Sequence, residues 1–328
     1  GILHRYSISD LHGYAGHFDP QTITAIKTRK EVAYVQRNRL WWINAQRVTQ
    51  SHPPCGLNLI SHRGISQEEK GYTYDSSSGK GTTVYVVDTG VDIEHHEFEG
   101  RAFNGFTINH TDGFSDNVGH GTHVAGILGS KASGVAKKCD IIAVKVLEGT
   151  SGPESGVMAG FDWAVKEIVS AKAQRKSVIN VSLGGPFSPS WNRFADKAFE
   201  LGVVTVVSAG NMNMDASNQS PGSAASVISV SATNQHRVRW SSSNWGKGVT
   251  LFAPGVDIVS TWPDQENKEG NATMTSMAAP YVTGIALYLQ AMRMFNVRSV
   301  KETIAGIATR KVVGDIRGSP NLFAYNNG

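Results

Sequence analysis

Thr83-Val84-Tyr85-Val86-Val87-Asp88-Thr89-Gly90 is the stretch that decides the fold class, because a run of β-branched and aromatic residues ends on an acidic residue and a turn. From about residue 82 onward, short apolar runs like this one alternate with helical segments, as in a parallel sheet covered on both faces. The later runs predicted as strands are residues 141–146, 178–182, 203–208 and 227–230. We therefore expect an α/β main body with a mostly parallel central sheet.

Three segments of this main body have helical spacing. Residues 155 to about 174 and residues 191–201 each carry an apolar stripe, which predicts amphipathic helices. Residues 276 to about 295 are apolar almost all round, and such a helix belongs in the middle of a domain.

The N-terminal 47 residues have a different pattern, with Asp19 as a helix N-cap and Pro20 in the first turn of that helix. Strands are predicted at residues 5–8, 14–18 and 32–36. We expect a small α+β unit over residues 1–47 and the α/β domain over residues 48–328, which opens with a Ser/Gly/Pro-rich connection.

Composition excludes several function classes. A chain of 328 residues with 40% hydrophobic content can bury a large core. Residues 1–47 hold seven Lys/Arg against three Asp/Glu, which leaves 24 against 24 in the rest, so the net charge of +4 belongs to the N-terminal segment. A neutral main body makes nucleic acid an improbable partner, and no apolar stretch approaches the ~18 residues of a membrane helix. Two cysteines, Cys55 and Cys139, favour free thiols over a bridge.

Four short motifs lie far apart in the chain and carry the polar residues that point to chemistry. Asp88 stands in Val-Asp-Thr-Gly, His120 in Gly-His-Gly-Thr-His, Asn211 in Ser-Ala-Gly-Asn and Ser276 in Thr-Ser-Met-Ala. The order Asp, His, Ser resembles that of the subtilisin-like serine proteases and differs from the chymotrypsin and α/β-hydrolase orders. A further stretch, residues 57–64, resembles the fungal, proteinase K-like members.

The resemblance implies a role for each of these residues. Ser276 would be the nucleophile, His120 the general base and then acid, and Asp88 the carboxylate that orients the imidazole. Asn211 and the Ser276 main-chain N–H would stabilise the oxyanion. Taken singly, each residue also has an ordinary interpretation as a turn former or a helix cap, so the joint pattern carries the hypothesis.

The same resemblance implies where a polypeptide substrate binds. Ser182, Leu183 and Gly184 match the edge strand that pairs with the substrate main chain. The first specificity pocket matches three residues with small side chains, Ser208, Ala209 and Gly210. We expect an endopeptidase of broad specificity that prefers a bulky apolar residue before the cut.

Two departures from the family pattern affect this expectation. Met274 stands where the family has Gly before Thr-Ser-Met-Ala. An added side chain there leaves open a weak or inactive homologue that acts by binding or is held in a permanently inhibited complex with its pro-segment. Thr250 stands where proteinase K-like enzymes have an Asp calcium ligand. A hydroxyl binds a hard cation less well than a carboxylate, so we expect this calcium site to be weakened or absent, with calcium elsewhere left open. The chemistry itself requires no cofactor.

A zinc protease is the metal alternative. Several potential ligands are concentrated in two segments: Glu94, His95, His96, Glu97, His120 and His123. Their spacing is not that of a His-Glu-x-x-His helix, so we expect no catalytic metal, and we interpret His123 as structural.

Residues 14–19 and 31–35 resemble the second half of the inhibitory propeptide of these proteases. The tail at residues 40–44 would occupy the cleft as a product does, with self-cleavage between Asn44 and Val48. No signal peptide is visible, so a processed or truncated form is expected, and the resemblance implies a secreted monomer. Asn-X-Ser/Thr sequons add weak support for secretion; they begin at Asn109, Asn180, Asn218 and Asn271.

Overall fold

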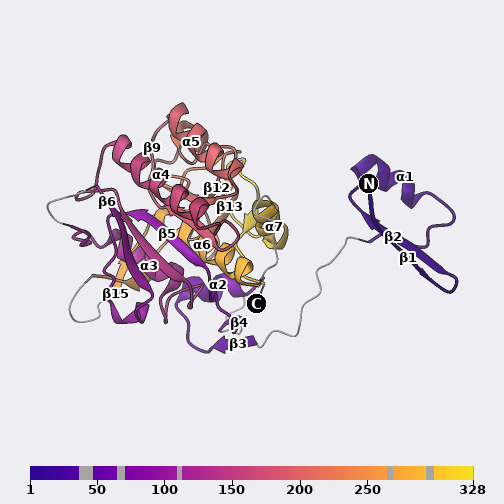
Figure 1. Cartoon of the computed structure of the whole chain (residues 1–328), viewed down its shortest axis with the longest axis horizontal. Coiled ribbons are helices and arrows are strands. Elements are labelled where there is room, and N and C mark those ends of the chain that lie inside the picture. The colour runs from indigo at the N-terminus through magenta and orange to yellow at the C-terminus, as the bar shows by residue number, and fades with distance from the viewer. Residues whose placement is uncertain (37–46, 65–70, 109–112, 264–268, 293–298, 328) are drawn as a thin grey trace. The chain divides into compact units, whose positions relative to one another are not determined.

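A computed structural model describes residues 1–36, 47–64, 71–108, 113–263, 269–292 and 299–327 (Figure 1). The chain forms two compact units, Gly1–Ala45 and Gln46–Gly328. In the first unit, β1 (Ile2–Ile8) pairs antiparallel with β2 (Leu11–Gly16), and α1 (Pro20–Lys27) follows. Asp19 caps α1 by accepting the Thr22 N–H at 2.8 Å, as predicted.

The prediction of a strand over residues 32–36 was wrong. Within the described part of the first unit, only β1 and β2 pair, and Val32 donates its N–H to the Arg29 carbonyl in a turn. The apolar residues Val32, Tyr34 and Val35 favour a strand by composition. Propensity alone does not make a strand, since its N–H and C=O groups need a neighbour to pair with.

The second unit is built on a nine-stranded sheet in the order β16-β17-β13-β12-β10-β8-β5-β7-β6. Only the edge pair β16–β17 is antiparallel, so the predicted fold class is confirmed. The strand bounds are β5 (Thr83–Asp88), β6 (Ala102–Thr107), β7 (Asp140–Lys145), β8 (Ser177–Val181), β10 (Val204–Ser208), β12 (Ile228–Thr233), β13 (Leu251–Pro254), β16 (Thr309–Arg310) and β17 (Leu322–Phe323).

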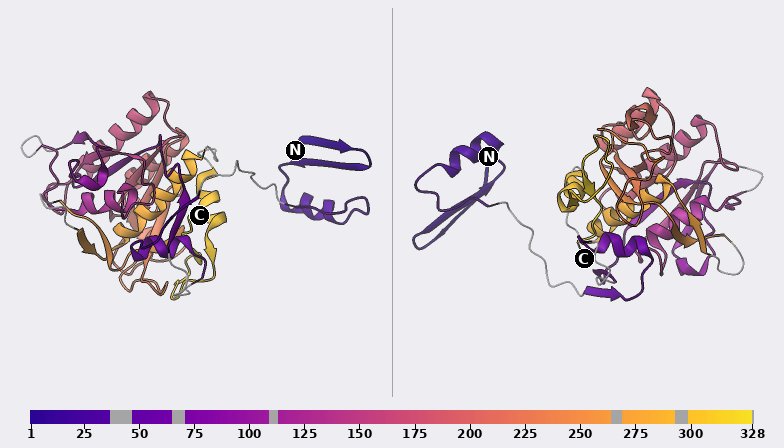
Figure 2. Two further views of the ribbon diagram at one scale, coloured as in Figure 1. Left: turned by 90° about the horizontal axis from the view of Figure 1, so that it is seen from below. Right: turned by 180° about the vertical axis from the view of Figure 1, so that it is seen from behind.

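Helices cover both faces of this sheet (Figure 2). The side chains of β5 alternate between two hydrophobic cores, one on each face. Val84 and Val86 of β5 point to the core that contains α2 (Cys55–Ser61), α3 (His120–Gly129), α6 (Thr275–Ala291) and α7 (Val300–Ile307). Tyr85 and Val87 point to the core under α4 (Glu154–Ser170) and α5 (Pro189–Glu200). All of α6 except its last residue is buried, which confirms the predicted central helix; residues 293–295 lie outside the described residues.

Short elements surround the large sheet. The two-stranded pairs are β3 (Arg47–Gln50) with β4 (Tyr72–Asp75), β9 (Gly185–Pro186) with β11 (Gln219–Ser220), and β14 (Ile258–Thr261) with β15 (Glu269–Ala272). The 3-10 turns are η1 (His96–Phe98) and η2 (Ala216–Asn218). Both cysteines are free thiols, and Cys139 is buried. Among the described residues, no helix is both long and apolar enough to cross a membrane.

Candidate active site

The four predicted catalytic residues come together at one edge of the large sheet, where the neighbouring parallel strands β5, β8 and β10 end. Asp88 is the last residue of β5, and His120 is the first residue of α3. Ser276 is the second residue of α6, and Asn211 follows the end of β10. The start of α3 is bonded to the end of β5 through His120 and Asp88, and the start of α6 is bonded to Ser182 just after β8.

Asp88 orients the imidazole of His120. The Nδ1–Oδ1 distance is 2.6 Å, and the Asp88 side chain is fully buried, whereas 17% of the His120 side chain is exposed. Burial lowers the pKa of His120, but the charge and hydrogen bond of Asp88, together with the charge of Asp116, outweigh it and raise the pKa above its usual value. The imidazole therefore becomes a neutral base only as the pH rises through this raised pKa.

Asp116 is a residue that the sequence analysis missed. Its buried carboxylate accepts the N–H groups of Val118, Gly119 and Thr122 and the hydroxyls of Thr89 and Thr122. These bonds fix the loop that leads into α3 and so set where His120 begins the helix. An acidic residue four positions before a helix-start histidine was the available signal, although a solvated loop residue has the same appearance in sequence.

The Ser276 segment is fixed by reciprocal bonds to the end of β8. Ser276 Oγ donates to the Ser182 carbonyl, and Ser182 Oγ donates to the Ser276 carbonyl, both at 2.9 Å. Buried Asn180 extends this network, because its Nδ2 donates to Ser182 Oγ and its Oδ1 accepts the Thr283 hydroxyl of α6. The Asn180 sequon is therefore inaccessible to a glycan.

Asn211 has a fixed amide orientation. Its Oδ1 accepts both the Thr275 N–H at 2.9 Å and the Thr275 hydroxyl at 2.7 Å. The carbonyl end of the amide is thereby held by donors of α6, and the Nδ2 end remains to donate elsewhere. The Ser276 N–H lies in the first turn of α6, where main-chain donors have no partner within the helix.

The six predicted substrate residues form two neighbouring segments. Ser182, Leu183 and Gly184 run from β8 into β9, and the Ser208 hydroxyl donates to the Leu183 carbonyl at 3.5 Å. Gly210 has φ +104°, and a Cβ there would overlap the side chains of Gln219 and Asn244, so this position requires glycine.

Asn244 is a second residue that the sequence analysis missed, and it organises the loop of Ala209, Gly210 and Asn211. Its Nδ2 donates to the Ala209 carbonyl at 2.9 Å, and its Oδ1 accepts the Met212 N–H at 3.0 Å. Its sequence surroundings, Ser-Ser-Asn-Trp, resemble an ordinary polar loop, so no local pattern marks this role.

Met274 is accommodated without backbone strain. Its φ is −166° and its ψ is 165°, which is extended backbone that any residue adopts. The side chain packs against the hydrophobic core, and the Met274 N–H donates to the Gly255 carbonyl at 2.9 Å. The departure from the family glycine therefore leaves the start of α6 in regular geometry.

We expect Met274→Gly to leave kcat/KM on a peptide substrate within about threefold of the parent, because the backbone angles suit either residue. The same change should lower the free energy of unfolding by about 1 kcal/mol, since apolar packing is lost and glycine is more flexible when unfolded. Peptide kinetics and denaturant unfolding measure the two effects. A tenfold rise in kcat/KM would show instead that Met274 crowds the site.

The potential metal ligands lie in separate groups, with His95, His96 and Glu97 around η1 and His123 in α3. Among the described residues, no three His, Cys, Asp or Glu side chains gather as a metal site. His123 is buried, and its Nε2 lies 3.0 Å from the Ile258 carbonyl and 3.1 Å from the Gly270 carbonyl. Burial lowers the pKa of His123 to about 4, so the ring stays neutral and ties α3 to β14 and β15.

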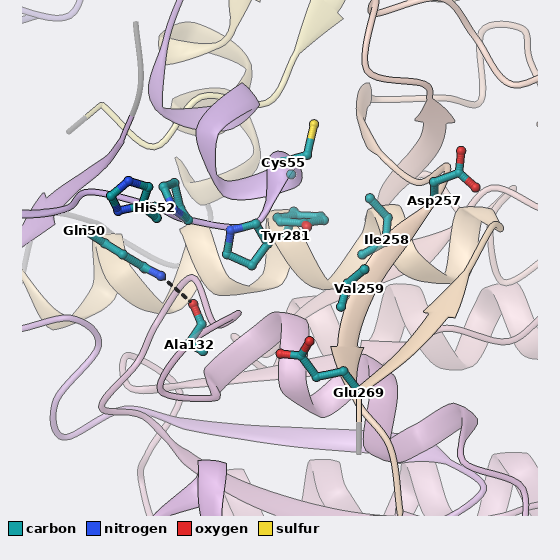
Figure 3. A pocket seen from close by; sticks show the side chains of 12 residues that line it. Gln50, His52, Cys55, Ala132, Asp257, Ile258, Val259, Glu269 and Tyr281 are labelled. Carbon is teal, nitrogen blue, oxygen red and sulfur yellow. Dashed lines mark hydrogen bonds between the residues drawn. The ribbon is translucent and has the colours of Figure 1, made fainter. Parts of the chain in front are cut away.

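A cavity of about 400 Å³ lies away from the four residues, between the loop before α2 and the β14–β15 pair (Figure 3). Its lining includes Pro54, Cys55, Asp257, Glu269 and Tyr281, and none of the predicted site residues. The candidate active site is therefore separate from this cavity.

Comparisons with known proteins agree with this geometry. The sequence profile of the subtilase family matches residues 79–324, and that of the peptidase inhibitor I9 family matches residues 1–43. Alkaline protease 1 of Aspergillus clavatus is 44% identical over 327 residues, which cover 99% of this chain and 80% of that protein. Alkaline proteinase of Hapsidospora chrysogena is 40% identical over 338 residues, covering 99% of this chain and 83% of that protein.

A solved structure shows the same fold. The crystal structure of a cold-adapted subtilisin-like serine proteinase superimposes with a TM-score of 0.78 at 37% identity, covering 84% of this chain and 99% of that one. The resemblance to fungal subtilisin-like proteases that the motifs indicated is thus confirmed. The chain belongs to the subtilase family of serine proteases.

Proposed function

We propose that this subtilase is an active endopeptidase that cleaves polypeptides through an acyl-enzyme on Ser276. The observation that carries the proposal is the 2.6 Å hydrogen bond between buried Asp88 and Nδ1 of His120. This bond holds the imidazole and leaves its Nε2 to serve as the base. Neither a turn residue nor a helix cap needs this pairing. The main argument for an inactive homologue that only binds was strain at Met274, and the backbone there is unstrained.

The reaction begins when the Ser276 hydroxyl turns from the Ser182 carbonyl to His120 by rotation of its side chain. His120 Nε2 takes the hydroxyl proton as Ser276 Oγ bonds to the substrate carbonyl carbon. The carbonyl oxygen becomes an oxyanion, which accepts from Asn211 Nδ2 and the Ser276 N–H. His120 then gives its proton to the leaving amine, and the C–N bond breaks to leave an ester on Ser276.

Water completes the cycle. His120 takes a proton from the attacking water, the hydroxide oxygen bonds to the ester carbon, and the C–O bond to Ser276 breaks. The proton returns to Ser276 Oγ, and a carboxylic acid product is released. Asp88 stays ionised throughout and stabilises the imidazolium form of His120 in both halves.

Asn211→Ala is expected to lower kcat by about 10²–10³-fold with little change in KM, because the amide donates to an oxyanion that exists only in the transition state. Steady-state kinetics on one peptide substrate separate the two constants. Exposed Asn218 in η2 provides the matched control, and Asn218→Ala should retain full activity. A rise in KM with unchanged kcat for Asn211→Ala would assign Asn211 to substrate binding alone.

For specificity, we propose a bulky apolar residue before the cut, because Ser208, Ala209 and Gly210 bring little side-chain volume to their segment. The polypeptide main chain would pair with Ser182, Leu183 and Gly184 and give little sequence preference of its own. Digestion of a peptide library, with product ends identified by mass spectrometry, tests this. Cutting only after Arg or Lys would refute it.

Residues 1–47 are proposed to act as an intramolecular inhibitor of the peptidase domain over residues 48–328, in keeping with the inhibitor I9 match. The segment proposed to fill the cleft, residues 40–44, and the Asn44 side of the cleavage region lie outside the described residues. Secretion and a monomeric state are further parts of the proposal. N-terminal sequencing of the active form should begin between residues 45 and 48, and a start upstream of residue 40 would contradict the inhibitor role.

The overall function is tested on an unstructured polypeptide such as reduced casein. The chain should release new carboxyl and amino ends, and Ser276→Ala should release none. Binding of casein without cleavage by the parent protein, freed of residues 1–47, would favour the inactive homologue.

A further inference from the structure

Lys301, the second residue of α7, directs its ammonium group into a pair of main-chain carbonyls. Its Nζ donates to the Ala225 carbonyl and to the Val227 carbonyl, both at 2.8 Å. These carbonyls lie two residues apart, immediately before β12, and both oxygens approach one positive centre. The ammonium thus takes the position that a small cation would take between convergent oxygens.

The neighbouring strand brings Thr250 to the same segment. Thr250 donates its N–H to the Ser229 carbonyl at 2.8 Å, and its Oγ1 accepts the Ser229 N–H at 3.1 Å. Ser229 is two residues beyond Val227, which is about 7 Å along an extended chain. The Thr250 hydroxyl is therefore engaged with main chain, and the position offers no carboxylate, so these residues do not fit a calcium site.

Asp196 of α5 holds the same segment from the other side. Its Oδ1 accepts the Ser226 N–H at 3.1 Å, between the two residues whose carbonyls face Lys301. Burial lowers the pKa of Lys301, while the charges of Glu302 and Asp196 oppose that shift. The segment 225–227 is thus bound through its two carbonyls by a cation and through its N–H by an anion.

We propose that the Lys301 ammonium is a built-in replacement for a structural metal ion, so that the segment before β12 is held without calcium. The bond ties α7 to the large sheet through that segment. The segment continues back to Gln219, whose side chain accepts from Asn244 behind the Asn211 loop.

Thermal unfolding of the full chain carrying Ser276→Ala, which prevents self-digestion, tests the proposal. The Tm should be the same within about 1 °C in calcium chloride and in chelator. In chelator, Lys301→Met should lower the Tm by about 4 °C or more, because two main-chain carbonyls lose a charged donor. Exposed Lys247 gives the matched control, and Lys247→Met should leave the Tm unchanged. An unchanged Tm for Lys301→Met overturns the proposal.

A designed gain of calcium binding tests the same site independently of the fall in Tm expected for Lys301→Met. The double variant Thr250→Asp/Lys301→Ala supplies a carboxylate and frees both carbonyls, so its Tm should rise by several degrees in calcium chloride relative to chelator. Thr250→Asp alone should remain insensitive to calcium, because the ammonium still occupies the carbonyls. Calorimetric titration with calcium alone should show one added site in the double variant only.

The outcomes separate cleanly. If Lys301→Met does not accumulate as folded protein, the double variant decides: folding in calcium but not in chelator supports the proposal, and failure in both contradicts it. One further outcome would contradict the proposal. The Tm of the parent would depend on calcium, Thr250→Asp would leave that dependence unaltered, and Lys301→Met would abolish it. Binding of the metal would then depend on the lysine.

Discussion

His120→Ala is expected to reduce kcat by about 10⁶-fold, the size of the loss that removal of the same base causes in subtilisin. The expectation follows from the geometry, because Asp88 and Asp116 are arranged around this one imidazole. Without it, the Ser276 hydroxyl has no base, and the leaving amine has no acid. Steady-state assays on a chromogenic peptide measure kcat. The remaining activity of His120→Ala should resemble that of Ser276→Ala.

A second histidine provides the control. The His96 side chain is 53% exposed and stacks on His95 near η1, so His96→Ala should retain full activity. The double variant of His120→Ala with Ser276→Ala should be no slower than either single variant, since the two groups act as a unit. Losses that multiply in the double variant would contradict a shared mechanism.

Asp88→Asn is the change with the next largest expected effect, a loss of about 10⁴-fold in kcat near neutral pH. The carboxylate accepts a hydrogen bond from His120 Nδ1–H, which leaves Nε2 free to act as base. The amide that replaces this carboxylate can donate to Nδ1 and so favours the tautomer with its proton on Nε2, which cannot take one from Ser276.

The pH profile adds a second readout for Asp88. The raised pKa of His120 predicts that kcat/KM of the parent rises with pH through a midpoint above 6.5. Removing the charge of Asp88 removes a cause that raises this pKa, so the midpoint should move to lower pH. A midpoint that stays in place, or a loss in kcat under tenfold, would show that Asp88 does not act on His120.

The sequence was sufficient for the central strands, because parallel strands buried on both faces are continuous apolar runs. β8 and β10 begin and end within one residue of the strands predicted over residues 178–182 and 203–208. Residues 32–36 have similar composition without becoming a strand, since pairing depends on a neighbour that composition does not reveal.

The catalytic candidates were recognisable because each stands in its own local motif. Asp116, Asn244 and Lys301 were not, because their roles come from bonds to segments that are distant in sequence or lack a motif. Met274 shows the complementary limit. The sequence identified the departure from glycine, but only the backbone angles could show that it is harmless to the start of α6.

Labelling by a fluorophosphonate probe tests the central claim most directly, because the probe reacts only with a serine that its base has activated. The protein freed of residues 1–47 should acquire one phosphonyl group, and peptide mapping should place it on Ser276. Ser276→Ala and His120→Ala should remain unlabelled while folded. A folded parent protein that takes up no probe, or takes it up at a serine other than Ser276, would contradict the account.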